Sequence, residues 1–149
     1  SDVPSEAYEC DYLTGANVFG RTSVLNRIGY LPEDYFLYYE ETDWFMRARE
    51  YGERPLLFPD MHLAHWKRSE VGGLPTKTYF YYFVRNAYLF GDRYAKGSLA
   101  AREAKLADFR ESWLKVIREK APEREAEFER LFERATKDGM CGVSGKVAL

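Results

Sequence analysis

Cysteine and histidine are scarce in this chain, and their scarcity removes several classes of site. The 149 residues include two cysteines, Cys10 and Cys141, and two histidines, His62 and His65. Two thiols near opposite ends of the chain form no disulfide framework and match no metal-binding spacing, so a reducing compartment is the simplest setting. On a strand, the two histidines would point to opposite faces and could not hold one metal ion together.

Long apolar runs and a charge excess are also missing. No run of about 18 apolar residues and no signal peptide is recognisable, so we expect no transmembrane segment. The 22 basic and 24 acidic residues give a formal net charge of −2. That balance provides no general attraction to nucleic acid or to an anionic membrane. A soluble globular chain that binds no nucleic acid is therefore expected.

Aromatic residues are abundant, with 12 Tyr, 10 Phe and 3 Trp. Most Phe rings are expected in the core. The pattern predicts one long helix over 76–94 that carries rings on every side. Such a helix is either buried or in contact with a partner or a membrane interface. Burial against the C-terminal helices is the preferred interpretation, and interfacial contact is the alternative.

Apolar periodicity, glycine stops and capping residues predict the other elements. Helices are predicted over 22–28, where Thr22 would be the cap, over 41–51 and over 99–120, followed by a helix that begins near Pro122 and ends at Gly139. A strand is predicted over 12–19, and extended segments over 54–58 and 61–66. Residues 67–75 are predicted to be a polar loop and residues 140–149 a loose tail.

Three carboxylates, those of Glu40, Glu41 and Asp43, fall within four residues at the predicted start of a helix. Crowded like charges raise one another's pKa, so folding alone gains little from this cluster. A helix N-terminus tolerates anions because its free N–H groups and positive dipole end face them. A carboxylate held there has the fixed direction and the adjusted pKa that a general base needs.

Two structural interpretations of the cluster remain open beside the catalytic one. Acidic residues in the first turn of a helix are common capping groups. Asp43 and Arg47 are spaced i,i+4, so they can simply pair on the helix surface.

The surroundings of the cluster resemble the C-terminal, acceptor-side half of a family 2 glycosyltransferase of the rhamnosyltransferase-like kind. The matching segments are 11–29 (DYLTGANVFGRTSVLNRIG), 36–52 (FLYYEETDWFMRAREYG), Pro59, His65, 69–73 (SEVGG) and 81–86 (YYFVRN). Each motif alone is weak or moderate, but their order and spacing together are more specific.

This resemblance implies roles for the acidic cluster. The family pattern is two acidic residues, any residue, then Asp-Trp, and an Arg follows; its second acid is the base that takes the proton of the acceptor hydroxyl. Here that position is Glu41. Glu40 would orient the acceptor, and Asp43 with Arg47 would support the site structurally.

Further residues follow from the same comparison. Gly15 matches a small-residue turn beside the substrates, and Tyr38, Tyr39 and Trp44 are candidate acceptor-binding rings. His65 matches a histidine that reaches the divalent cation, Mg²⁺ or Mn²⁺, in some members of the family. Lys67 and Arg68 are weak candidates for binding a diphosphate, and a solvated basic loop is an equal interpretation.

The resemblance also implies a fold and its division. The class is α/β, or α+β when this part stands alone: the C-terminal half of a GT-A fold over residues 1–95, then a charged helical hairpin and tail over 96–149. The Asp-x-Asp motif that holds the metal in GT-A enzymes is absent from the sequence. The cation is therefore expected to be held mostly by residues outside this chain, and the chain alone is expected to be inactive.

The implied activity is inverting transfer from a nucleotide-sugar to a glycan or lipid-linked acceptor, in polysaccharide or cell-envelope synthesis. A cytoplasmic location is expected, with peripheral contact at the inner face of the membrane as a further expectation. Sheet edges without their partner strands invite pairing, so self-association is also expected. The alternative function is a non-catalytic carbohydrate-binding or assembly module.

Overall fold

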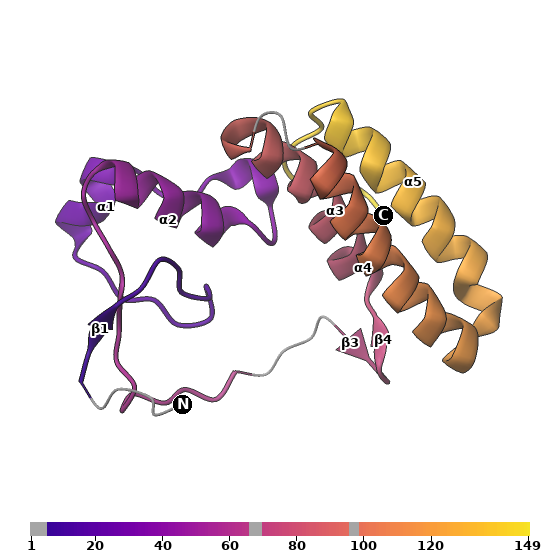
Figure 1. Ribbon diagram of the computed structural model, residues 1–149, viewed down its shortest axis with the longest axis horizontal. Coiled ribbons are helices and arrows are strands. Elements are labelled where there is room, and N and C mark those ends of the chain that lie inside the picture. Colours follow the sequence, from indigo (N-terminus) through magenta and orange to yellow (C-terminus); the bar gives the residue numbers. More distant parts are fainter. Residues whose placement is uncertain (1–5, 66–69, 96–98) are drawn as a thin grey trace. The chain divides into compact units, whose positions relative to one another are not determined.

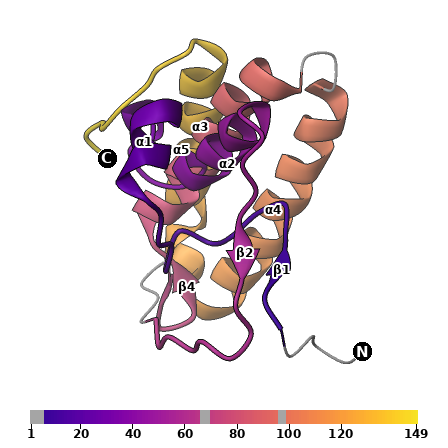
Figure 2. The ribbon, with the colours of Figure 1, turned by 90° about the vertical axis from the view of Figure 1, so that its left-hand side faces the viewer.

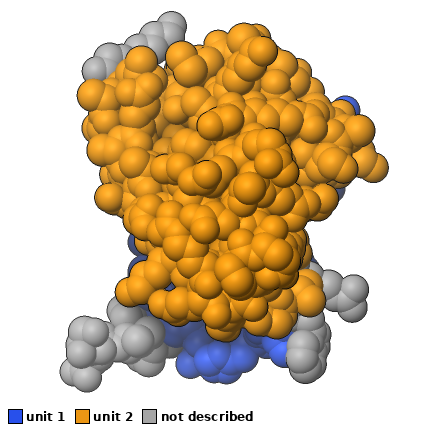
Figure 3. Space-filling model, turned by 90° about the vertical axis from the view of Figure 1, so that its right-hand side faces the viewer, with its two compact units in different colours: residues 1–33, 40–66 blue, residues 34–39, 67–149 orange. Residues whose placement is uncertain are grey.

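The computed structural model describes residues 6–65, 70–95 and 99–149. The chain divides into two compact units, residues 1–33 with 40–66 and residues 34–39 with 67–149 (Figure 3). The described residues form five α-helices, two 3-10 helices and two small two-stranded sheets, so the fold is mixed α/β and mostly helical (Figure 1). The helix over 76–94 shares its unit with the two helices that follow it.

The first unit contains two helices and one two-stranded sheet. The helices are α1 (Thr22–Ile28) and α2 (Glu40–Glu50). Strand β1 (Tyr8–Glu9) pairs antiparallel with β2 (Leu56–Leu57), with Tyr8 opposite Leu57. Figure 2 shows the two strands side by side.

Side chains of α2 form hydrogen bonds with the backbone of the turn that follows α1. Arg47 donates from Nη1 to the carbonyl of Ile28 at 3.0 Å and from Nη2 to that of Tyr30 at 2.7 Å. Trp44 Nε1 donates to the carbonyl of Gly29 at 2.7 Å. Gly29 ends α1 at φ +94°, which a residue with a Cβ rarely adopts, so glycine is required at this position.

The second unit is built around three helices. They are α3 (Lys77–Tyr94), α4 (Leu99–Lys120) and α5 (Glu125–Met140), with the short 3-10 helix η2 (Pro122–Arg124) between the last two. The remaining 3-10 helix, η1 (Glu33–Tyr35), lies where the chain passes from one unit to the other. The side chain of Thr76 caps α3 by accepting a hydrogen bond from Tyr79 N at 3.1 Å.

The core of this unit is aromatic and lies between α3, α4 and α5. It consists of Phe80, Tyr81, Tyr82, Val84, Ala87, Tyr88, Leu106, Leu114, Ile117, Phe128, Leu131 and Ala135. Helices α3 and α5 approach closely at Gly139, where a Cβ would lie 2.8 Å from the backbone oxygen of Arg85. The predicted burial of α3 against the C-terminal helices is therefore confirmed.

The strand predicted over 12–19 is wrong. These residues are irregular, with a turn at Gly15 and Ala16, and the strand lies earlier, at Tyr8–Glu9. A strand exists only where another segment offers hydrogen-bonding partners, and β2 offers them to residues 8 and 9. Residues 61–65 also form no strand, and Trp66 lies outside the described residues.

Two smaller expectations also need correction. Thr22 does not cap α1, because Arg21 occupies the N-cap position and makes no side-chain cap bond. Part of the predicted loop over 67–75 is a hairpin of β3 (Glu70–Val71) and β4 (Leu74–Pro75). Gly72 and Gly73, at φ +62° and +73°, form its turn, because both central positions need the left-handed region that glycine adopts freely.

The C-terminal tail is not loose. Gly145 N donates to the carbonyl of Asp34 at 2.5 Å. The hydroxyl of Tyr82 accepts from Val147 N at 2.9 Å and donates to Val147 O at 3.3 Å. These bonds tie the last residues to α3 and to the 34–39 segment.

Candidate functional site

The acidic cluster occupies the first turn of α2, as the sequence predicted, but its three carboxylates have different surroundings. Asp43 is fully buried and accepts from Arg47 Nε at 3.0 Å, the predicted i,i+4 pair. Because Arg47 also holds the turn after α1, this pair fixes α2 against α1. Glu40 and Glu41 are only partly buried. They are therefore the acids available for chemistry.

Only one of the two carboxylate oxygens of Glu41 has a hydrogen-bond partner among the described residues. Its Oε1 accepts a hydrogen bond from the hydroxyl of Tyr12 at 3.1 Å. Its Oε2 is shielded from solvent and has no hydrogen-bond partner within the described part of the chain. A Cβ placed on Gly15 would lie 3.4 Å from Cδ of Glu41. The turn at Gly15 therefore lies against this carboxylate and adds no side chain to cover it.

Of the predicted site residues, the structure brings Glu40, Glu41 and Gly15 into the same unit and adds Tyr12 to them. Sequence reasoning did not select Tyr12. Its only signal was its place in the 11–29 motif, because the predicted strand there gave its hydroxyl no particular partner. Tyr12 is 46% exposed.

Burial and charge shape the titration of this site. Burial raises the pKa of Glu40, and the neighbouring charge of Glu41 raises it further, while a backbone hydrogen bond partly opposes both. The Oε2 atom of Glu40 is also shielded without a partner among the described residues. Burial likewise raises the pKa of the Tyr12 hydroxyl, and the charge of Glu41 and the hydrogen bond to it add to the effect.

The raised pKa of Glu40 predicts a pH-dependent penalty on stability. The folded chain holds this proton more tightly than the unfolded chain does, so the penalty is absent at low pH, where both states are protonated. It grows as the pH rises past the ordinary value of 4.5 and through the folded pKa. We expect Glu40→Gln to raise the free energy of unfolding above that range by roughly 1 kcal/mol or less, since the group is half exposed.

Urea unfolding at a series of pH values, from about 4 to 7, checks this expectation. Glu50→Gln, an exposed position at the other end of α2, is the control and should leave the pH profile unchanged. A Glu40→Gln profile that still follows the wild type would show that another group titrates.

The three rings predicted to bind the acceptor do not share one unit. Trp44 belongs to the first unit, and its indole N–H is already engaged with Gly29. Tyr38 and Tyr39 belong to the second unit, where they pack on α3. The ring of Tyr38 lies 5.3 Å from that of Tyr79, and the ring of Tyr39 lies 5.7 Å from that of Phe83. Burial raises the pKa of Tyr39 to about 12.

The predicted cation and phosphate ligands are less well defined. His62 and His65 are both exposed in an irregular segment, so the argument that assumed a strand there no longer applies. Lys67 and Arg68 lie outside the described residues. Within residues 6–65, 70–95 and 99–149, no three His, Cys, Asp or Glu side chains are grouped closely enough to hold a metal ion. The described residues thus do not fit a complete cation site.

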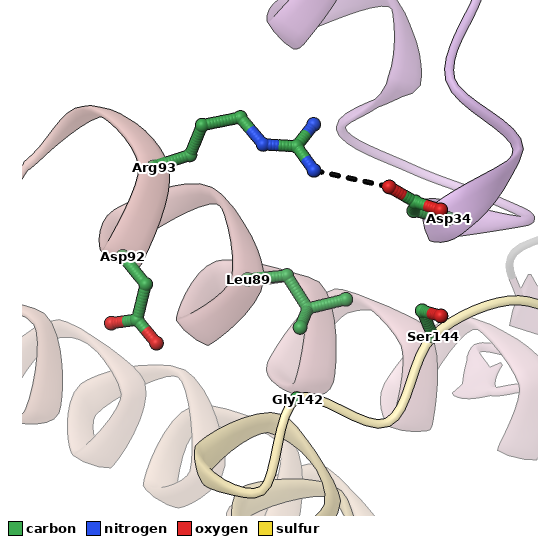
Figure 4. Close-up of a pocket in the computed structure, with 6 residues that line it drawn as sticks. All are labelled: Asp34, Leu89, Asp92, Arg93, Gly142 and Ser144. Carbon is green, nitrogen blue, oxygen red and sulfur yellow. Dashed lines mark hydrogen bonds and ion pairs between the residues drawn. The ribbon is translucent and has the colours of Figure 1, made fainter.

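An open hollow of about 400 Å³ lies within the second unit. Its lining residues are Asp34, Leu89, Asp92, Arg93, Gly142 and Ser144. Figure 4 shows Arg93 reaching across to Asp34, with which it forms an ion pair at 3.0 Å. Asp92 is paired with Arg102 at 3.0 Å. The charged side chains that line the hollow therefore already form ion pairs between segments of this unit.

Comparisons with known proteins found no match among family models, curated proteins or solved structures. No helix among those the structure describes is both long enough and apolar enough to cross a membrane.

Proposed function

We propose that this chain supplies the acceptor side of an inverting family 2 glycosyltransferase, with Glu41 as the general base. The motif order over residues 11–86 suggests the family. The observation that carries the proposal is the state of the Glu41 carboxylate, which has one oxygen held by Tyr12 and the other unpaired, beside a glycine turn.

A general base needs a fixed carboxylate with a free lone pair. The bond from Tyr12 restrains the direction of the carboxylate, and Oε2 keeps its capacity to accept. Leaving such an acceptor shielded and unpaired costs roughly 1–3 kcal/mol, which a donor hydroxyl from a bound acceptor would recover. Since Oε2 is shielded, acceptor binding must move a neighbouring side chain.

The proposed reaction is a single displacement at the anomeric carbon of the donor sugar. The acceptor hydroxyl loses its proton to Glu41 as its oxygen forms the new glycosidic bond. The bond from the anomeric carbon to the diphosphate breaks, and its electron pair leaves with the nucleoside diphosphate. Glu40 lies beside the base, and its raised pKa lets it keep a proton at higher pH than an ordinary glutamate, so it can donate to an acceptor oxygen.

We assign no role in donor binding to these residues. A donor half that is not part of this chain would bind the nucleotide-sugar and supply most of the coordination sphere of the Mg²⁺ or Mn²⁺ ion that the resemblance implies. Transfer to a glycan or lipid-linked acceptor and a cytoplasmic site of action belong to the same proposal. We accordingly expect no turnover from the 149 residues alone.

Gly15 provides the test. In the complete enzyme, Gly15→Val should cover the Glu41 carboxylate and raise the acceptor KM about tenfold or more, by analogy with the ~1–3 kcal/mol that one misplaced group costs in a binding pocket. Gly15→Ala is the matched control, because its Cβ would make only ordinary contact at 3.4 Å. Initial rates of nucleoside diphosphate release at varied acceptor concentration measure both. An unchanged acceptor KM in the valine variant would place the acceptor elsewhere.

A further inference from the structure

Residues 34–39, which lead directly into Glu40, have a strained backbone. Phe36, Tyr38 and Tyr39 have φ values of +63°, +66° and +77°, and within the described ranges no other residue except glycine has a positive φ. The left-handed region costs an L-amino acid with a bulky side chain roughly 1–2 kcal/mol. Three such residues within four positions persist only if the surroundings hold them in place.

Asn86 on α3 supplies one part of that support. Its side chain is fully buried. Its Nδ2 lies 3.0 Å from the carbonyl oxygen of Tyr35, 2.6 Å from that of Leu37 and 2.8 Å from that of Tyr38. Its Oδ1 accepts from Arg85 Nε at 2.8 Å. The amide group of Asn86 therefore contacts three carbonyl oxygens of the strained segment, and its hydrogen bond with Arg85 fixes its orientation.

Arg85 supplies the second part, and it is also fully buried. Its Nη2 donates to the carbonyl of Tyr35 at 2.7 Å and to that of Asp34 at 3.3 Å. Its Nη1 donates to the carbonyl of Gly145 at 2.6 Å. The guanidinium lies 4.7 Å from the ring centroid of Tyr82. A buried charge is tolerated only when it is well paired, and here backbone carbonyls and an aromatic ring provide the pairing.

The tail completes the arrangement from the opposite end of the sequence. Gly145 both accepts from Arg85 and donates to the carbonyl of Asp34, and Val147 is held through both its backbone groups by the hydroxyl of Tyr82. In Figure 4, Asp34, Leu89 of α3 and Ser144 of the tail line the same hollow. Residues of α3 and of the tail thus both form hydrogen bonds with carbonyl oxygens of residues 34–39.

We propose that Arg85, Asn86 and tail residues 145–147 form a clasp that holds residues 34–39 in this conformation. The clasp stands on the contacts above and does not depend on the proposed function.

Tyr82→Phe tests the clasp in the chain as it is, because it deletes the hydroxyl that holds Val147 and keeps the ring beside Arg85. We expect amide hydrogen exchange at residues 145–147 and 35–39 to become about 2- to 10-fold faster, as the loss of one or two hydrogen bonds predicts. Tyr51→Phe is the control. It removes the hydroxyl of a half-exposed tyrosine that belongs to the first unit, so it should leave exchange in both segments unchanged.

The two outcomes of the exchange experiment are distinct. Faster exchange in both segments supports the clasp. Faster exchange in the tail alone, or in neither segment, overturns the tail's part in it.

Discussion

On the proposed function, replacing Glu41 with Gln should lower turnover of the complete glycosyltransferase by about 10²- to 10⁴-fold, the range that general base catalysis supplies. The amide keeps the size of the side chain and still accepts a hydrogen bond from Tyr12 through its oxygen, so α2 and the turn at Gly15 should be undisturbed. It cannot take a proton from the acceptor hydroxyl. The loss should therefore fall on kcat, with the affinity for the nucleotide-sugar nearly intact.

Two further variants make this expectation specific. Glu50→Gln removes an exposed carboxylate from the other end of the same helix and should leave kcat unchanged. Tyr12→Phe removes the 3.1 Å hydrogen bond to Glu41 Oε1 and should cost no more than about tenfold, because only the orientation of the base is affected. Single-turnover rates with saturating donor, together with calorimetric titration of the donor, separate chemistry from binding. Turnover retained by Glu41→Gln would move the base to another residue.

The helices were predictable because their signals are local. The predicted bounds of 99–120 are those of α4. The first helix ends at Ile28 as predicted, but Thr22 is its first residue rather than its cap. The bounds of α2 and α3 differ from the prediction by one residue at one or both ends. Apolar residues at helical spacing and Gly29 and Gly52 as stops are properties of short windows of sequence, so they need no knowledge of distant partners.

Strand β2 lies within the extended segment predicted over 54–58. Strand β1 was not predictable, because its partner lies about fifty residues away in the chain. Tyr8 and Glu9 pair with Leu56 and Leu57, and nothing in either two-residue segment distinguishes it from its neighbours. The segment over 12–19 has more of the expected composition but no partner for its backbone. The same limit explains the tail, whose order comes from hydrogen bonds to Asp34, Tyr82 and Arg85.

The candidate site was predictable in part. The cluster of Glu40, Glu41 and Asp43 at a helix start and the i,i+4 pair of Asp43 with Arg47 were visible in the sequence. The bond from Tyr12 and the unpaired oxygen of Glu41 arise from a turn about thirty residues earlier, so no local pattern announces them. The catalytic role of Glu41 remains a prediction that only the kinetic test decides.

Arg85 and Asn86 illustrate a different limit. A charged residue within a helix is normally assigned to the solvent side, since Arg is rarely buried without partners. Here the partners are backbone carbonyls of a segment about fifty residues away, and their orientation requires positive φ values at bulky residues. No sequence rule assigns Phe36, Tyr38 or Tyr39 to that region, because it is unfavourable for each of them taken alone. The hydrogen bonds from Arg85 and Asn86 explain how residues 34–39 keep their strained conformation. The carbonyl groups of that segment in turn explain how these two polar side chains can be buried.

Asn86→Leu should therefore destabilise the second unit by about 3–5 kcal/mol, a large share of the ~5–15 kcal/mol that a typical domain possesses. Leucine has a similar volume but removes the donor from three carbonyls and the acceptor from Arg85 Nε. Each buried polar group that loses its partner costs roughly 1–3 kcal/mol, and Tyr35 keeps a second donor in Arg85. Urea unfolding followed by the fluorescence of Trp113, with the other tryptophans replaced, measures the change in this unit.

Two further variants show which interaction accounts for the stability that Asn86→Leu loses. Asn26→Leu, at an exposed position of α1, should change the free energy of unfolding by less than about 0.5 kcal/mol, which excludes a general effect of the substitution. Asn86→Asp keeps the acceptor for Arg85 and replaces the amide donor with an oxygen that faces the carbonyls of Leu37 and Tyr38. If the donors hold the strained segment, the aspartate variant should lose most of the stability that the leucine variant loses. An aspartate variant as stable as the wild type would mean that Arg85 alone carries the segment.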